Sequence, residues 1–73
     1  MACISADGKP TESGTRMLRA IKSGLGSPEE IANDTGLSLF RVRSGLREIT
    51  QAGLATETSG RYQITEKGEE LIK

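Results

Sequence analysis

The chain has 73 residues, and its ten Lys and Arg balance ten Asp and Glu, so the formal net charge at pH 7 is zero. A chain of this length holds one small domain with one core. It has no histidine and a single cysteine, Cys3, which excludes a disulfide framework and a Cys/His metal site. The balanced charge argues neither for nor against a polyanionic partner.

Several other classes of protein are excluded by the residues present. No apolar run approaches the roughly 18 residues of a membrane span, and the opening MACISADGKP lacks the order of a signal peptide. We therefore expect a cytoplasmic protein without a membrane partner. Ser44 and Cys3 have no histidine to activate them, and no phosphate-loop or calcium-loop motif is present. We expect no enzymatic activity, no metal and no cofactor.

The N-terminal part of the sequence predicts a tail and one helix. Residues 1–12 are mostly small or polar and lack periodicity, which favours a flexible tail before a domain at residues 13–73. The first predicted helix runs from Thr15 to about Ser23, and Gly24 ends it. Its apolar residues recur at helical spacing: Met17, Leu18 and Ile21.

The segment SPEEIANDTG predicts a short second helix. Ser27 is a suitable N-cap, Pro28 occupies the first helical position, and Glu30 can close a capping box. Gly36 ends this helix because glycine readily adopts positive φ. A third helix follows at once, with Ser38 as its cap and the motif QAGL at its end. Two helices joined by a short turn that contains glycine form a helix-turn-helix.

The remaining sequence predicts a hairpin and a last helix. In LATETSGRYQIT every second residue belongs to an alternating series, with Leu54, Thr56 and Thr58 before Ser59-Gly60 and Tyr62 and Ile64 after it. This pattern is typical of two antiparallel strands joined by a tight turn. EKGEELIK predicts a short helix that begins near Thr65. The expected fold is α+β and mainly α: a three-helix core, a two-stranded hairpin and a short C-terminal helix.

The third helix carries the least expected side chains. A projection at about 100° per residue places Val42, Leu46 and Ile49 within about 60° of one another, which defines a core stripe. Burial of a phenylalanine ring is worth about 1.5 to 3 kcal/mol, so an exposed one suggests a partner. The opposite side and its flank hold the outward residues: Phe40, Arg41, Arg43, Ser44 and Arg47.

These outward residues also have ordinary structural explanations. Surface arginines are usually solvated or ion-paired, and Glu48 or Asp34 could approach those of the third helix. Phe40 has a second placement, folded over the turn onto Leu37. The charges also form separate groups along the sequence, which predicts distinct electrical faces. These groups are Arg16, Arg19 and Lys22; Arg41, Arg43 and Arg47; Glu29, Glu30 and Asp34; and Glu66, Glu69 and Glu70.

From SPEE onward the sequence resembles the winged helix-turn-helix of bacterial and archaeal transcriptional regulators, the group that includes the MarR-like, ArsR-like and PadR-like families. The matching motifs are EEIA…TGLS, V-x-x-x-L-x-x-I-x-x-x-G-L and Y-x-I-T-x-K-G. The resemblance covers about Thr15 to Lys73, and these motifs specify no single family. The resemblance implies a recognition helix at Ser38–Gln51 and a wing from about Ala55 to Ile64.

What the resemblance implies for function is sequence-specific binding of double-stranded DNA by a small transcriptional regulator. The recognition helix would enter the major groove, and the wing would touch the backbone or minor groove. Arginine and serine can bond base edges or phosphates, and an apolar side chain can touch a thymine methyl group. The residues expected to contact DNA are Ser38, Phe40, Arg41, Arg43, Ser44, Arg47 and Arg61.

Arg61 also has an ordinary structural explanation, because it is equally explained as a hairpin charge opposite Glu57. A monomer with few phosphate contacts would bind weakly, so useful specificity requires a homodimer or a larger protein partner. The alternative function is a protein–protein interaction module that uses the face formed by Phe40, Arg43 and Arg47, with the phenylalanine as its apolar anchor.

Overall fold

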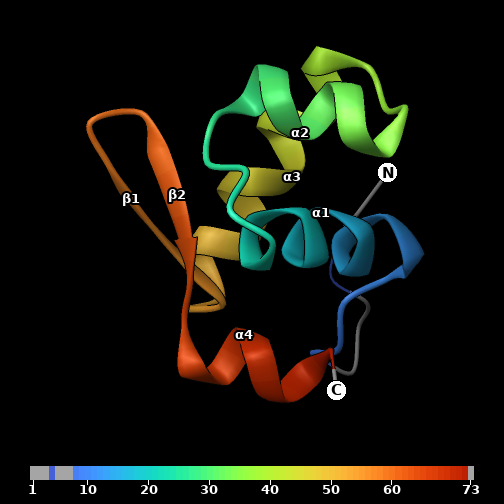
Figure 1. Ribbon diagram of the computed structural model, residues 1–73. Coiled ribbons are helices and arrows are strands. Elements are labelled where there is room, and N and C mark those ends of the chain that lie inside the picture. Colours follow the sequence, from blue (N-terminus) through green and yellow to red (C-terminus); the bar gives the residue numbers. More distant parts are fainter. Residues whose placement is uncertain (1–3, 5–7, 73) are drawn as a thin grey trace.

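The computed structural model describes residue 4 and residues 8–72 (Figure 1). Its elements are α1 (Glu12–Lys22), α2 (Pro28–Thr35), α3 (Leu39–Gln51), β1 (Ala55–Thr58), β2 (Arg61–Ile64) and α4 (Glu66–Leu71). The first three helices pack together, while the β1–β2 hairpin extends to one side and α4 lies beside α1 (Figure 1). This arrangement confirms the predicted α+β, mainly helical winged helix.

The start of α1 differs from the prediction. The helix begins at Glu12 instead of Thr15, because Thr11 caps it and its Oγ1 accepts a hydrogen bond from the Gly14 amide at 3.4 Å. An ion pair of 3.0 Å between Glu12 and Arg16 also stabilises the first turn. Apolar periodicity does not detect this turn, since its residues are polar or small.

Part of the predicted flexible tail at residues 1–12 lies outside the described residues, and Cys3 is in that part. Ile4 is described, and it forms an isolated antiparallel bridge with Pro10 and packs against the core. The flexibility of this segment stays a prediction.

The helix-turn-helix is built by the predicted caps. Ser27 Oγ accepts a hydrogen bond from the Glu30 amide at 3.2 Å, and Glu30 Oε1 accepts one from the Ser27 amide at 3.3 Å, which completes the capping box. Gly36 has a φ of 77° and ends α2. Ser38 Oγ then accepts from the Arg41 amide at 3.3 Å and starts α3. The turn between the helices is therefore fixed by local hydrogen bonds.

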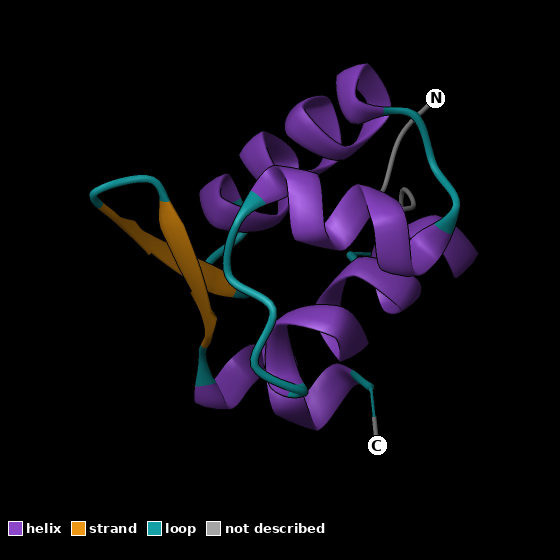
Figure 2. Ribbon diagram, turned by 45° about the horizontal axis from the view of Figure 1, so that its top comes forward, coloured by secondary structure: helices purple, strands orange, loops and turns teal. Residues whose placement is uncertain are grey.

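The helices and the hairpin are arranged as Figure 2 shows, and apolar side chains from all of them form the core. Val42, Leu46 and Ile49 of α3 are completely buried, as the helical projection predicted. Leu39, the first residue of α3, is 36% exposed. The other buried apolar residues are Met17, Leu18, Ala20, Ile21, Ile31, Leu54, Ala55 and Ile72.

The hairpin has the predicted two-residue turn, in which Ser59 and Gly60 have φ values of 51° and 82°. Positive φ at both turn residues is the conformation that matches the twist of tight hairpins. The register places Thr58, and not Glu57, opposite Arg61, so the cross-strand explanation of the arginine is wrong. Glu57 lies opposite a tyrosine and accepts a hydrogen bond from the Gly60 amide at 2.6 Å.

Two close approaches hold the hairpin against the helices. The Tyr62 amide donates to the Gly26 carbonyl at 2.8 Å, which ties β2 to the link between α1 and α2. On the other side, α4 begins near Thr65 as predicted, with Thr65 as its N-cap, and Gly68 lies against the Leu54 backbone. A Cβ atom at Gly68 would collide with the Leu54 carbonyl oxygen, so glycine is required for this packing. The orientation of the wing is thus set at its base.

Candidate nucleic-acid interface

The outer face of α3 is exposed because the inner face is fully used by the core. Phe40 is 83% exposed, so its alternative placement against Leu37 is wrong. Arg43, Ser44 and Arg47 are exposed on the same helix. An apolar ring beside two guanidinium groups and a hydroxyl offers both van der Waals contact and hydrogen-bond donors. This combination suits the major-groove edges of bases.

The two arginines at the centre of this face differ in their neighbours. Arg43 Nη2 lies 3.6 Å from Glu29 Oε2 of α2, so the carboxylate that approaches α3 is Glu29 and not Asp34. Asp34 instead lines a separate hollow with residues of α1. Within residues 4 and 8–72, no carboxylate forms an ion pair with Arg47. Arg47 therefore presents its guanidinium to solvent without an ion-paired carboxylate from the described residues.

The first residues of α3 are less available for contacts with DNA than the sequence suggested. Ser38 is exposed, but its hydroxyl oxygen is already engaged as the helix cap. Arg41 is exposed on the flank of the helix, directly after Phe40. Any contact from Ser38 to DNA would have to be made by its O–H group while the oxygen still caps the helix.

A groove of about 390 Å³ runs between α3 and the hairpin. Arg43 and Arg47 line one side, and Tyr62 and Glu57 line the other. The sequence analysis used Tyr62 only to predict the hairpin and did not assign it to the site. The same reasoning left out Gln51, although its spacing of four residues from Arg47 places it on the same helix face. The complete lining is Pro28, Arg43, Arg47, Thr50, Gln51, Glu57 and Tyr62.

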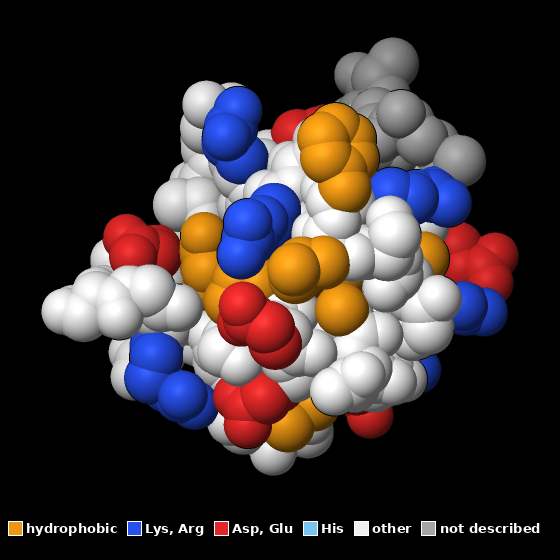
Figure 3. Space-filling view, turned by 90° about the horizontal axis from the view of Figure 1, so that it is seen from above, with side chains coloured by type: hydrophobic (Ala, Val, Ile, Leu, Met, Phe, Trp, Pro, Cys, Tyr) orange, Lys and Arg blue, Asp and Glu red, His pale blue; other side chains and the backbone are white. Residues whose placement is uncertain are grey.

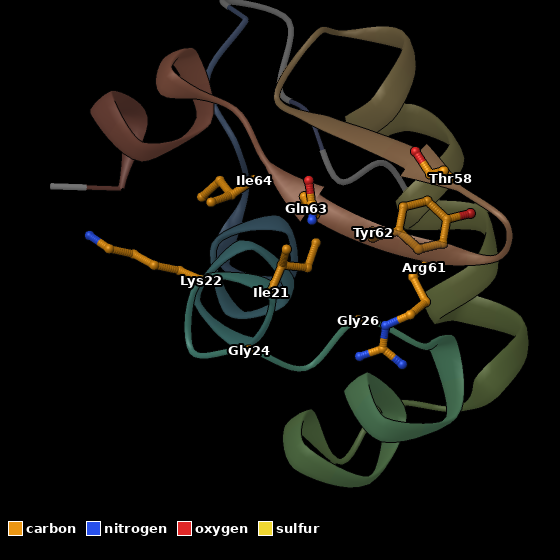
Figure 4. Close-up of a pocket in the computed structure, with 9 residues that line it drawn as sticks. All are labelled: Ile21, Lys22, Gly24, Gly26, Thr58, Arg61, Tyr62, Gln63 and Ile64. Atoms are coloured by element: carbon orange, nitrogen blue, oxygen red, sulfur yellow. The ribbon is translucent and has the colours of Figure 1, made fainter.

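Arg61 lies on the other side of the hairpin. Its guanidinium extends over Gly26 toward α2 (Figure 4), and its Nη2 is 3.7 Å from Glu30 Oε1. A second hollow, of about 580 Å³, lies here between β2 and the link after α1. The structure does not bring Arg61 together with Arg43 and Arg47, which line the groove on the opposite side of the hairpin.

Basic and acidic side chains are mixed on one face of the molecule. Figure 3 shows blue, red and orange side chains interspersed on the face that is uppermost in Figure 1. Acidic groups of one element pair with basic groups of another, because neighbours in space are not neighbours in sequence. Examples are Arg43 with Glu29, Arg61 with Glu30, and Lys22 with Glu69 at 3.7 Å. The expectation of distinct electrical faces over the whole molecule stays a prediction.

The structure clearly perturbs the ionisation of Glu30. A hydrogen bond of 3.0 Å from the Ser27 hydroxyl is the main cause that lowers the pKa of Glu30 below its ordinary value, followed by the Ser27 amide. The amide of Gly26 and the positive charge of Arg61 act in the same direction. The ionised form of Glu30 is thus bound into the first turn of α2, directly beside Glu29.

Comparison with known proteins agrees with this architecture. Residues 12–73 match the family described as winged helix-turn-helix, and the chain belongs to that family. This fold is typical of non-enzymatic DNA-binding domains. No curated protein matches the sequence significantly. Among the described residues, no helix has the length and apolar character to cross a membrane, and no group of three or more His, Cys, Asp or Glu could hold a metal ion.

Proposed function

We propose that this protein binds double-stranded DNA sequence-specifically as a small cytoplasmic transcriptional regulator. In this proposal α3 lies in the major groove and the β1–β2 hairpin lies against the backbone or minor groove. The observation that carries the proposal is the outer face of α3, where Phe40, Arg43 and Arg47 project from a helix whose opposite face is completely buried. Winged helices present such a face to DNA.

The proposed roles follow from the surroundings of each side chain. Arg43 and Arg47 bond bases or phosphates, and Phe40 contacts an apolar group such as a thymine methyl. The remaining contacts come from Ser38, Arg41 and Ser44. Arg61 reaches the backbone only by leaving Glu30, which is a small change because both side chains are about half exposed or more, at 62% and 48%.

The charge of the whole chain limits the affinity of one copy. With a net charge of zero, non-specific attraction to DNA is weak. Two copies bound to adjacent half-sites, or a larger protein partner, would raise the effective affinity without any new contact.

A second candidate function is favoured by one observation, the exposure of Phe40 at 83%. A protein partner could bury this ring, with Arg43 and Arg47 at the rim. Response to salt separates the two functions, because phosphate contacts release counterions and apolar contacts do not.

An amide-resolved NMR titration with a mixed-sequence duplex tests the proposal. At low salt we expect shifts over Ser38–Arg47 and in the wing residues Thr58–Arg61, and weaker shifts near physiological salt. If these amides do not respond at low salt, the DNA function is wrong. A search for a protein that buries Phe40 would then follow.

A further inference from the structure

Glu29 belongs to α2, yet its carboxylate stands beside the outer face of α3. Its distance of 3.6 Å from Arg43 is an ion pair in which both side chains remain mostly exposed, at 63% and 62%. The start of α2 is fixed by Pro28 and by the capping box, so Glu29 has a defined position next to the groove. The Glu29 carboxylate, a hydrogen-bond acceptor, and the Arg43 guanidinium, a set of donors, therefore face solvent side by side.

This pair has little value for folding, since exposed ion pairs contribute little to stability. On a surface that faces DNA, the same carboxylate opposes the phosphates and weakens non-specific attraction. Arg43 is thereby directed away from simple phosphate binding, whereas Arg47 has no acidic partner among the described residues. The two arginines are suited to different tasks.

The chemistry of a G·C base pair matches the pair formed by Arg43 and Glu29. In the major groove, guanine exposes two acceptors, N7 and O6, and cytosine exposes the N4 amino donor beside them. Arginine can donate to both guanine atoms, and glutamate can accept from cytosine N4. An A·T pair interrupts the two acceptors with a donor, so it does not satisfy the same arrangement.

We propose that Glu29 is a specificity-determining residue of the DNA interface, which together with Arg43 recognises one G·C base pair. Glu29 also lowers the affinity for other sequences, because once Arg43 has turned to the bases the carboxylate needs a hydrogen-bond donor at the position of the cytosine amino group. This inference rests on the proposed DNA-binding function and adds to it a base preference and a residue outside α3.

The test begins with selection of a preferred duplex from a randomised library by the intact protein. Binding of that duplex and of base-substituted versions is then measured by fluorescence anisotropy for the wild type and for Glu29→Ala. The control is Glu70→Ala, which removes the same charge from an exposed position on α4. Both changes place alanine at an exposed helical site, so neither should prevent folding.

For the wild type, replacement of one G·C pair by A·T should weaken binding about tenfold or more. Inosine·C at that position should bind like G·C, since inosine keeps the major-groove edge of guanine. Glu29→Ala should bind random duplexes several times more tightly and should lower the A·T penalty to about threefold or less. Glu70→Ala should leave the penalty unchanged.

The inference is overturned if no G·C pair is preferred, or if Glu29→Ala keeps the wild-type preference. Arg47→Ala separates this failure from failure of the proposed function. If Arg47→Ala weakens binding while Glu29→Ala leaves the base preference intact, DNA binding stands and only the role of Glu29 is wrong. If wild type and Arg47→Ala bind every duplex equally poorly, both proposals are wrong.

Discussion

Arg43 and Arg47 lie one helical turn apart on the exposed face of α3, but only Arg43 has a carboxylate beside it within the described part of the chain, Glu29 at 3.6 Å. A guanidinium without a partner is available to a phosphate at once. A guanidinium beside a carboxylate has to share its donors, and its orientation is restricted. The two arginines are therefore expected to affect DNA binding in different ways.

Arg47→Ala should weaken binding to all duplexes by a similar factor, because a phosphate contact carries no sequence information. The log–log dependence of affinity on salt should have a slope of about −3 to −5 for the wild type, and Arg47→Ala should reduce its magnitude by about 1. Arg43→Ala should instead lose about 1 to 3 kcal/mol on the preferred sequence and relax its discrimination. Anisotropy titrations over a salt series measure both effects.

Arg16→Ala is a suitable control for these variants. Arg16 is exposed on α1 and pairs within that helix with Glu12, so its removal changes the net charge equally without touching α3. For Arg16→Ala, the log–log slope of DNA affinity against salt concentration should remain close to that of the wild type. Equal losses for Arg16→Ala and Arg47→Ala would mean that DNA responds only to total charge and not to the α3 face.

Phe40→Ala should leave the free energy of unfolding within about 0.5 kcal/mol of the wild type, since the ring is 83% exposed. Leu46→Ala, on the buried side of the same helix, should lose about 2 to 5 kcal/mol. Urea denaturation measures both values. A large loss of stability for Phe40→Ala would show that the ring packs on the domain in solution.

The same Phe40→Ala variant separates the two candidate functions. A DNA-binding face should be weakened less by Phe40→Ala than by Arg43→Ala. An apolar protein anchor at Phe40 should behave in the opposite way, with a loss of about 2 kcal/mol or more in partner binding. Titrations of both variants with duplex DNA show which substitution weakens DNA binding more, and this order decides between the two functions.

Gly68→Ala and Gly26→Ala should differ in stability although both glycines are buried. At Gly68 the added Cβ meets the Leu54 carbonyl, which cannot move without shifting β1, so a net loss of about 1 to 3 kcal/mol is expected. At Gly26 the nearest atom is Arg61 Nη2, 2.8 Å from the built Cβ, at the end of a flexible side chain. This change should lose less than about 1 kcal/mol. Equal losses in urea denaturation would contradict the difference in packing.

Much of the fold could be predicted from the sequence because it is specified by short-range chemistry. The cap at Ser27, the positive φ of Gly36 and the turn at Ser59-Gly60 depend on residues within a few positions of one another. Apolar spacing likewise identified the buried face of α3. The first turn of α1 was missed because its stability comes from Thr11 and a charge pair, and neither contributes to apolar periodicity.

The exposed residues of the candidate site could be predicted for the same reason, but their partners could not. Which carboxylate lies beside Arg43 depends on how α2 crosses α3, and the choice between Glu29 and Asp34 is a matter of tertiary geometry. The position of Arg61 over Gly26 depends on where the hairpin docks. Periodicity assigns a side chain to a face of its own element and says nothing about the element opposite.

The stability of the protein should depend on the ionisation of Glu30. Hydrogen bonds from Ser27 lower the pKa of this carboxyl in the folded protein below its ordinary value of 4.5. The ionised form therefore stabilises the folded state, and this contribution is fully present above the ordinary pKa. It is lost as the pH falls through the lowered pKa of the folded protein, because protonation then occurs in both states.

Glu30→Gln isolates this contribution, since glutamine can still accept the capping hydrogen bond but does not ionise. We expect the wild type to be more stable than Glu30→Gln at about pH 6 and the difference to shrink toward about pH 3. The other carboxyl groups titrate in both proteins and largely cancel in the comparison, and Glu70→Gln reports the general effect of removing one negative charge. Urea denaturation over this pH range measures the difference. A difference that stays constant or grows as the pH falls would mean that the capping box holds Glu30 equally well in its neutral form.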